Sequence, residues 1–217
     1  IPFAIARAFY IANTGRPGPV LIDITKDAQF AEFDFAYNSC EKIRSYHPYP
    51  EASLSDLESA ANLINAAKKP YMLVGQGVQL SGAENELIQF AEKTGIPMAA
   101  TLMGLSGIST SHPLYVGYLG MHGNYGPNIK TNECDLLIAI GMRFDDRVTG
   151  DLDQYAKQAK VIHIEIDPAE INKNVKATVA INCDAKQALL GLLPLVNVST
   201  HKDWINEFHK CDEIEFN

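Results

Sequence analysis

The stretch Cys134–Gly150 constrains the fold of this chain more than any other segment. It opens with the apolar run Leu136–Ile140, which is bounded by Asp135 and Gly141. An uninterrupted apolar run of this length is typical of a strand that is buried on both faces of a parallel sheet. The sequence therefore predicts an α/β fold that contains this strand.

Four charged residues follow the predicted strand within a short distance, namely Arg143, Asp145, Asp146 and Arg147. Ligands of open α/β sheets bind beyond the carboxyl ends of the strands. Arginine forks suit phosphate, and carboxylates can hold the arginines or accept ribose hydroxyls. The same charges would also suit a surface loop whose side chains neutralise one another. The residue types alone leave both interpretations open.

Strand and helix signals alternate along most of the chain and predict a doubly wound parallel sheet. Helices are predicted for Pro2–Asn13, from Ser53 onward, for Ala83–Thr94, after Pro168, for Ala185–Leu193 and within the polar stretch Val196–Asn217. Strands are predicted for Val20–Ile24, Tyr71–Val74, Pro97–Ala100, Leu136–Ile140, Val161–Ile166 and Val179–Asn182.

Charge and composition exclude several classes of function. The net charge of −8 disfavours nucleic acid as a partner, because binding to phosphate backbones needs basic patches. No apolar run has the length of a membrane span, and residues 1–9 lack the pattern of a signal peptide. The cysteines show no C-x-x-C spacing, so we expect reduced thiols and a cytoplasmic protein without a zinc site.

Five segments, in order, carry a resemblance to a known family. They are GRPGPVLIDITKD (Gly15–Asp27), ATLMGL (Ala100–Leu105), LGMHG (Leu119–Gly123), RFDDRVTG (Arg143–Gly150) and HIEIDPAEI (His163–Ile171). Together they resemble the large subunit of the acetolactate synthase (acetohydroxyacid synthase) family, whose members use thiamine diphosphate and also carry FAD. The resemblance implies a Rossmann-like central domain that binds FAD.

The resemblance also implies how the chain is divided. Residues 1–27 would be the tail of an amino-terminal, pyrimidine-binding domain, and residues 28–50, rich in aromatic residues and ending in prolines, a linker. Residues 51–195 would form the central FAD-binding domain, and 196–217 a linker towards a further, carboxyl-terminal domain.

Most of the implied FAD contacts follow predicted strands, and they are assigned by matching the family's motifs. Arg16, otherwise a surface arginine in a salt bridge, would reach the cofactor from the preceding domain. Glu165 stands where the family more often has Asp, and its longer carboxylate should still reach. The full implied set is Arg16, Gly75, Gly77, Thr101, Leu102, Met121, His122, Gly123, Gly141, Arg143, Asp145, Arg147, Val148, Glu165, Ile166 and Asp184.

The residues themselves leave local alternatives open for several of these assignments. Gly75 and Gly77 complete only half of a G-x-G-x-x-G fingerprint and would equally suit a tight turn. Thr101 and Asp184 could each cap nearby backbone. His122 could be an ordinary turn histidine, whereas the resemblance places it beside the flavin in a binding role.

The resemblance implies a function for a longer protein. That protein would condense two pyruvates, or pyruvate with 2-oxobutyrate, in branched-chain amino-acid biosynthesis. Its thiamine diphosphate and magnesium would lie outside this segment, so we assign no catalytic residue and no metal ligand here. We also expect a homo-oligomer and a small regulatory subunit. The alternatives are the central domain of another thiamine enzyme, of the glyoxylate carboligase or oxalyl-CoA decarboxylase type, and a non-catalytic structural domain.

Overall fold

The computed structural model describes residues 1–215 and divides the chain into two compact units. The first comprises Ile1–Pro50, and the second begins at Glu51. Each unit is described by itself. Within the described residues, no helix combines the length and the apolar character that crossing a membrane requires.

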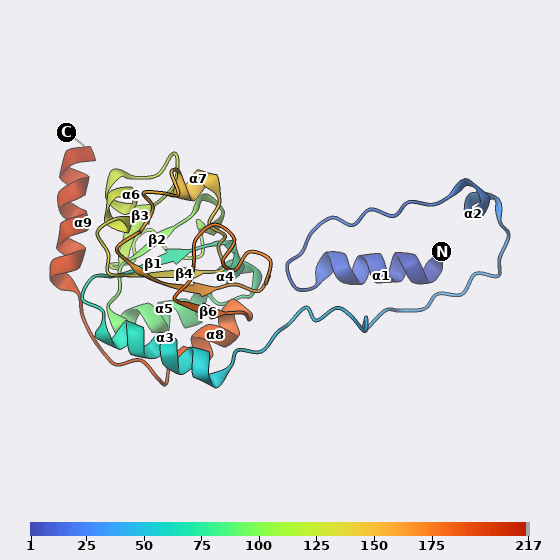
Figure 1. Cartoon of the computed structure of the whole chain (residues 1–217), viewed down its shortest axis with the longest axis horizontal. Helices are drawn as coiled ribbons and strands as arrows, with labels where there is room; N and C mark the ends of the chain where they lie inside the picture. The colour runs from blue at the N-terminus through green and yellow to red at the C-terminus, as the bar shows by residue number, and fades with distance from the viewer. Residues whose placement is uncertain (216–217) are drawn as a thin grey trace. The chain divides into compact units, whose positions relative to one another are not determined.

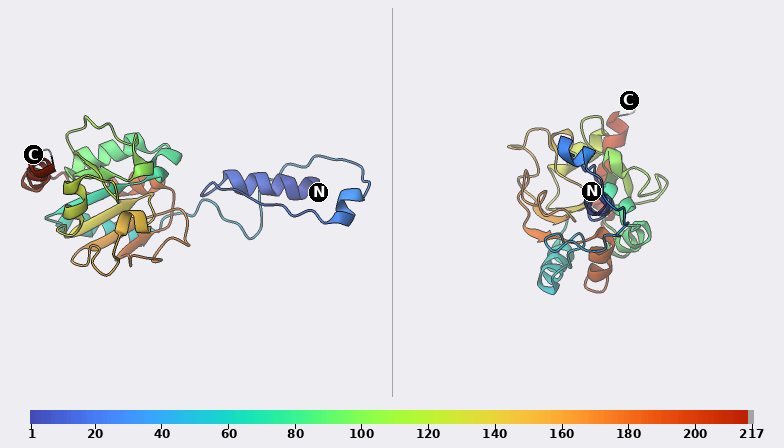
Figure 2. Two further views of the ribbon diagram at one scale, coloured as in Figure 1. Left: turned by 90° about the horizontal axis from the view of Figure 1, so that it is seen from above. Right: turned by 90° about the vertical axis from the view of Figure 1, so that its right-hand side faces the viewer.

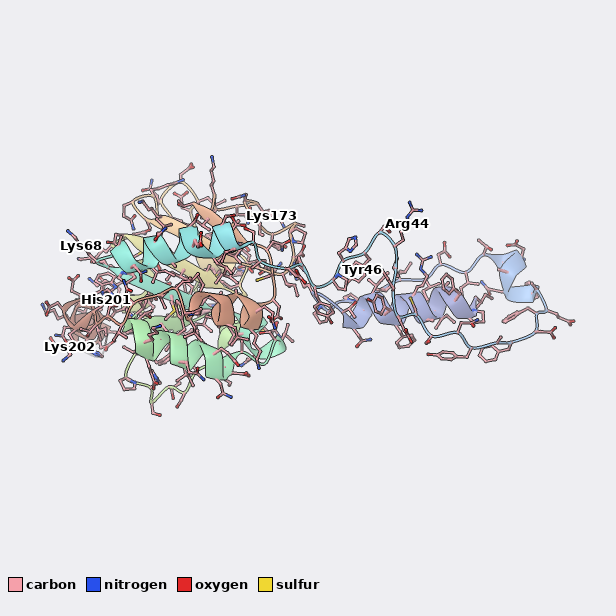
Figure 3. All side chains as sticks on the ribbon, turned by 90° about the horizontal axis from the view of Figure 1, so that it is seen from below. Arg44, Tyr46, Lys68, Lys173, His201 and Lys202 are labelled. Carbon is pink, nitrogen blue, oxygen red and sulfur yellow. The ribbon has the colours of Figure 1, made fainter. Side chains whose placement is uncertain are left out.

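The first unit contains two helices, α1 (Pro2–Asn13) and α2 (Lys26–Phe30). The strand predicted for Val20–Ile24 is wrong, because its residues form neither strand nor helix here. A strand needs a partner for its backbone groups, and the described residues of this unit supply none. Tyr46, labelled in Figure 3, donates a hydrogen bond of 2.8 Å to the carbonyl of Thr14, just beyond α1.

The second unit is built on a six-stranded, all-parallel sheet, which confirms the predicted fold class (Figure 1). The strands lie in the order β3-β2-β1-β4-β5-β6, so the chain works outward from β1 in one direction and then from β4 in the other. The strands are β1 (Pro70–Val74), β2 (Met98–Ala100), β3 (Tyr115–Tyr118), β4 (Leu136–Ile140), β5 (Lys160–Ile164) and β6 (Val179–Ile181).

Side chains of the central strands alternate between two apolar cores, one on each face of the sheet. Met72 and Ile138 belong to the first core, which the first group of helices covers. Leu73 and Leu137 belong to the second core, on the opposite face. Because both faces are covered, every residue of β1 and β4 is buried. The first group of helices is α3 (Leu54–Ala66), α4 (Gln76–Leu80), α5 (Glu84–Thr94) and α8 (Ala185–Leu192), and Figure 2 shows the layers from two further sides.

The opposite face is covered by α6 (Tyr125–Thr131) and α9 (Lys202–Glu215). Trp204 and Phe208 of α9 are buried, and the indole nitrogen of Trp204 donates a 2.9 Å hydrogen bond to the carbonyl of Pro70. The helix within Val196–Asn217 is confirmed as far as Glu215, and its last two residues lie outside the described range. It packs into the second core as part of this unit.

Several elements differ from the sequence-based expectations. The structure adds β3, α6, the short helix α7 (Asp146–Thr149) and the 3-10 turn η1 (Leu102–Gly104). The predicted turn at Gly75–Gly77 is the start of α4, with Gly75 as its N-cap. The helix predicted after Pro168 is wrong, because residues 168–173 form only turns and a bend.

Candidate functional site

Because every strand of the sheet is parallel, all six carboxyl ends point to one edge of the second unit, here called the carboxyl edge. Every predicted contact except Arg16 follows a strand at this edge. Arg16 lies in the first unit, three residues beyond the end of α1. The residues at the edge are Gly75 and Gly77 after β1, Thr101 and Leu102 after β2, Met121, His122 and Gly123 after β3, Gly141, Arg143, Asp145, Arg147 and Val148 after β4, Glu165 and Ile166 after β5, and Asp184 after β6.

Three glycines lie where the strand order reverses, in the loops that follow β1 and β4. A Cβ atom on Gly75 would clash with the carbonyl oxygen of Gly141, and one on Gly77 would lie 2.6 Å from the Cα of Gly141. Gly141 itself has φ +58°, a conformation that favours glycine. These three residues therefore let the two loops touch at the position where open α/β sheets bind ligands.

The backbone amides of these glycines are already engaged. Gly75 donates to Ile140 at 2.9 Å, Gly77 to Gly141 at 2.8 Å, and Gly141 to Ile164 at 2.9 Å. Phosphate binding through these particular amides, which the glycines suggested in the sequence, would require breaking loop-to-loop bonds. Their contribution to a ligand site is therefore one of shape, because these glycines carry no side chains that would block the approach of a ligand.

The arginines of the β4 loop pair with carboxylates of the same loop. Arg143 lies 3.2 Å from Asp145, and Arg147 lies 4.0 Å from Asp146. The arginine side chains are 52% and 70% exposed, so these pairs hold the guanidinium groups only weakly. Asp145 also caps α7 by accepting a hydrogen bond from the amide of Arg147. The loop thus presents two solvent-exposed cationic forks that an anion could recruit.

The loop after β3 reaches across to the loop after β4. The amide of Met121 donates a 2.8 Å hydrogen bond to the carbonyl of Arg147. Gly120, with φ +118°, makes this approach possible, because a Cβ there would lie 2.9 Å from the same carbonyl. The side chain of Asn128 holds Gly120 through both its amide and its carbonyl. The crossing places the Met121 thioether beside the guanidinium of Arg147, at 3.5 Å.

Large apolar side chains are exposed at the carboxyl edge. Leu102 is 68% exposed, and Met103 and Met121 are each 60% exposed. His122 and Gly123 lie in the same crossing loop as Met121, and the His122 side chain is exposed. Exposed thioether and leucine side chains suit contact with a flat, polarisable ring. Met103 was not among the predicted contacts, although it directly follows Leu102 and is exposed in the same way.

Two predicted contacts act as caps in this structure. Thr101 is the N-cap of η1, and its hydroxyl accepts a hydrogen bond from the amide of Gly104, the last residue of η1. The carboxylate of Asp184 accepts hydrogen bonds from the amides of Lys186 and Gln187, which lie in the first turn of α8. Both residues therefore cap nearby backbone, which was the local alternative to a ligand contact. Each cap also fixes a side chain at the carboxyl edge.

Glu165 is a buried carboxylate at the end of β5, with 7% of its surface exposed. Its side chain accepts a 3.1 Å hydrogen bond from the amide of Asp167. Asn182, which follows β6, donates to the carbonyls of both Glu165 and Ile166. Asn182 was not singled out in the sequence, because nothing local marks it. It fixes the backbone that carries the predicted ribose contact.

The buried thiol at this edge, Cys183, is not an activated nucleophile. Burial raises the pKa of the Cys183 thiol to about 11, and the carboxylate of Asp184 adds to the rise. Cys183 therefore stays a thiol at neutral pH, whereas nucleophilic cysteines need a lowered pKa. The carboxyl edge is therefore suited to binding a ligand. It combines exposed arginines, glycines that leave room for a ligand, exposed apolar side chains and a buried carboxylate that can accept hydrogen bonds.

Comparisons with known proteins show which proteins this chain is similar to. Residues 57–192 match the family described as thiamine pyrophosphate enzyme, central domain. The acetolactate synthase large subunit of Corynebacterium glutamicum is 49% identical over 92% of this chain and 32% of its own length. That of Haemophilus influenzae is 42% identical over 91% of this chain and 35% of its own length.

A solved structure shares the fold. It is an X-ray structure described as a thiamin diphosphate-dependent enzyme isolated from Mycobacterium smegmatis, with a TM-score of 0.71 and 26% identity. The match covers 92% of this chain and 38% of that one. The chain thus spans about a third of the length of the curated relatives named above. On its sequence and its six-stranded parallel sheet, the chain belongs to the family of thiamine pyrophosphate enzyme central domains.

Proposed function

We propose that the carboxyl edge binds FAD and that this chain is the FAD-binding central part of an acetolactate synthase large subunit. One observation carries the proposal: groups suited to the phosphates, the flavin ring and a ribose of FAD gather at the carboxyl edge of one sheet. Arg143 and Arg147 suit the phosphates, and the exposed Met121 suits a flat ring. The buried carboxylate of Glu165 suits a ribose hydroxyl.

In this proposal FAD has a structural role, because condensation of two 2-oxo acids involves no net electron transfer. The longer protein would condense two pyruvates, or pyruvate with 2-oxobutyrate, with thiamine diphosphate and magnesium held outside these residues. A homo-oligomer, a small regulatory subunit and a cytoplasmic location belong to the same proposal. The residues of this chain would bind and orient the flavin, and the chain alone would be inactive.

A purely structural carboxyl edge is the second candidate, and the ion pairs of the β4 loop favour it. Arg143 pairs with Asp145 and Arg147 with Asp146, as in a loop whose charges neutralise one another. Such a non-catalytic domain would bind adenine nucleotides no worse than FAD, so comparing its affinities for FAD and ADP separates it from the first candidate. Another thiamine enzyme of the carboligase or decarboxylase type would bind ADP, FAD or neither at the same edge.

The test is a titration of the 217-residue chain with FAD, followed by flavin fluorescence. The double variant Arg143→Ala, Arg147→Ala should bind FAD at least about tenfold more weakly, since each charge-assisted bond contributes roughly 1.5 to 3 kcal/mol. Its matched control is Arg7→Ala, Arg44→Ala, which removes the same charge from the first unit. Equal loss in both double variants, or no saturable binding by the wild-type chain, would count against the proposal. Displacement of FAD by equimolar ADP would favour the ADP-binding alternative.

A further inference from the structure

Arg143 lies between two buried neighbours. Met142 and Phe144 are each 4% exposed and belong to the second core, whereas the side chain of Arg143 is 52% exposed. Alternation of this kind is what extended chain produces, with successive side chains on opposite sides. The two buried side chains therefore anchor the segment while Arg143 stays on the solvent side.

Side chains from later in the chain hold the backbone on both sides of Arg143. The carbonyl of Met142 lies 2.9 Å from Nε2 of His163, which is on β5. The carbonyl of Phe144 accepts a 2.6 Å hydrogen bond from Nδ2 of Asn174. The carbonyl of Arg143 itself accepts from the amide of Asp145 at 3.1 Å. Three consecutive carbonyl groups are thus engaged.

The chemistry of His163 fixes its part in this arrangement. The side chain is fully buried, and its Nδ1 atom has no hydrogen-bond partner among the described residues. A carbonyl can only accept, so Nε2 must carry the proton and donate it to Met142. The Phe144 ring packs against the imidazole with their centroids 4.9 Å apart. His163 thus holds Met142 through a hydrogen bond and Phe144 through a ring contact.

Asn174 belongs to the loop between β5 and β6, next to Lys173, which Figure 3 labels. Lys173 pairs with Glu170 at 3.1 Å within the same loop. Asn174 is separated by 30 positions from the carbonyl it holds. It therefore ties the β5–β6 loop to the segment that presents Arg143.

We propose that His163 and Asn174 are positioning residues that hold Arg143 at the carboxyl edge in a binding-ready conformation. An arginine that is ordered in advance loses less conformational freedom when an anion binds, and this saving appears as affinity. The anion is the FAD phosphate, so this part of the inference rests on the proposed function. The anchoring of the backbone around Arg143 does not itself depend on any ligand.

The experiment compares three single variants with the wild-type chain. Asn174→Ala removes a donor at an exposed position and should leave folding intact. His163→Leu removes the buried donor, and His163→Gln restores one. The matched control is Gln158→Ala, because Gln158 also donates its side-chain amide to backbone carbonyls, those of Thr131 and Cys134, at the opposite end of β4.

The first readout is the order parameter of the Arg143 Nε–H bond from ¹⁵N relaxation, measured without ligand. It should fall in Asn174→Ala and His163→Leu, recover in His163→Gln, and stay at the wild-type value in Gln158→Ala. An unchanged order parameter in Asn174→Ala overturns the inference. If His163→Leu fails to fold, Asn174→Ala decides alone.

The second readout is FAD affinity in a double-mutant cycle. Asn174→Ala should raise the Kd roughly fivefold, the equivalent of one net hydrogen bond. The same substitution should have little further effect in an Arg143→Ala background, because nothing is left to position. Full additivity would contradict action through Arg143. If the wild-type chain does not bind FAD, the proposed function fails, and the order parameters still decide the positioning role.

Discussion

The amide of Met121 donates a 2.8 Å hydrogen bond to the carbonyl of Arg147, although β2 and β1 lie between the strands that precede these two residues. Neighbouring strands are about 4.8 Å apart, so the two loops close a span of about 14 Å. The contact joins the apolar and the cationic parts of the carboxyl edge. It therefore makes one continuous surface out of loops from both halves of the sheet.

Gly120→Ala should break this bridge. The new Cβ would lie 2.9 Å from the carbonyl of Arg147, in a backbone conformation of φ +118° that side chains rarely adopt. The control is Gly82→Ala, which has φ +60° but nothing within 4 Å of its Cβ. Backbone strain should cost each variant about 1 kcal/mol in the free energy of unfolding. Only Gly120→Ala should also weaken FAD binding, and equal affinities in the two variants would show that the bridge does not shape the site.

Gly77→Ala tests the contact between the loops after β1 and β4. Its Cβ would meet backbone, the Cα of Gly141 at 2.6 Å, so the loops must separate. Gly191→Ala is the control, because it too lies in a helix but would meet the end of the Leu57 side chain at 2.8 Å, which can move. Both gain helix propensity. We expect urea denaturation to show a loss of roughly 1 to 3 kcal/mol for Gly77→Ala and near-neutrality for Gly191→Ala. Equal stabilities would contradict the rigid contact.

The sequence was most informative about the buried strands. The apolar runs of β1 and β4 predict the positions of these strands directly, because a strand that is covered on both faces is apolar along its whole length. β3 was missed since Gly117 interrupts its apolar pattern, and α6 was missed since it contains Gly126 and Pro127. The predicted strand Val20–Ile24 failed for another reason, the absence of a pairing strand within the described first unit.

The carboxyl edge was predictable in outline because strand ends in a parallel sheet meet on one side. Its internal contacts were not, because they join residues far apart in the chain. Asn182 holds the carbonyl of Glu165, and Asn174 that of Phe144, and no local pattern marks either asparagine. The glycines after β1 show the same limit, since the sequence suggested donated amides and the structure shows those amides in use.

The pH dependence of stability should report on His163. Burial lowers the pKa of this imidazole, although its bond to Met142 and the charge of Glu170 oppose the shift. A histidine whose pKa is lower in the folded state stabilises the fold fully above its unfolded pKa of about 6.5 and loses that contribution as the pH falls below it. His163→Gln cannot titrate, so the stability gap between wild type and variant should narrow, or change sign, from pH 8 to pH 5. Parallel denaturation midpoints across this range would contradict a neutral, buried His163.

Glu215, at the far end of α9, should keep the loop between β3 and α6 ordered. Its carboxylate accepts a 2.9 Å bond from the side chain of Asn124 and a 3.0 Å bond from the amide of Tyr125, at the start of α6. Asn124 in turn accepts a bond from the amide of Tyr118, where β3 ends. Glu215→Ala removes an acceptor and a negative charge from the amino end of a helix, which should cost about 1 kcal/mol.

The measurement is amide hydrogen exchange over residues 118–126. Exchange should speed up about fivefold in Glu215→Ala, because the lost stabilisation is local and opening of the loop governs exchange. Glu58→Ala, which removes an exposed carboxylate from the middle of α3, should leave this segment unchanged. If both variants exchange like the wild type, Glu215 does not hold the loop. If Glu215→Ala loosens the loop and also weakens FAD binding, α9 supports the site through the same contacts that dock it on the sheet.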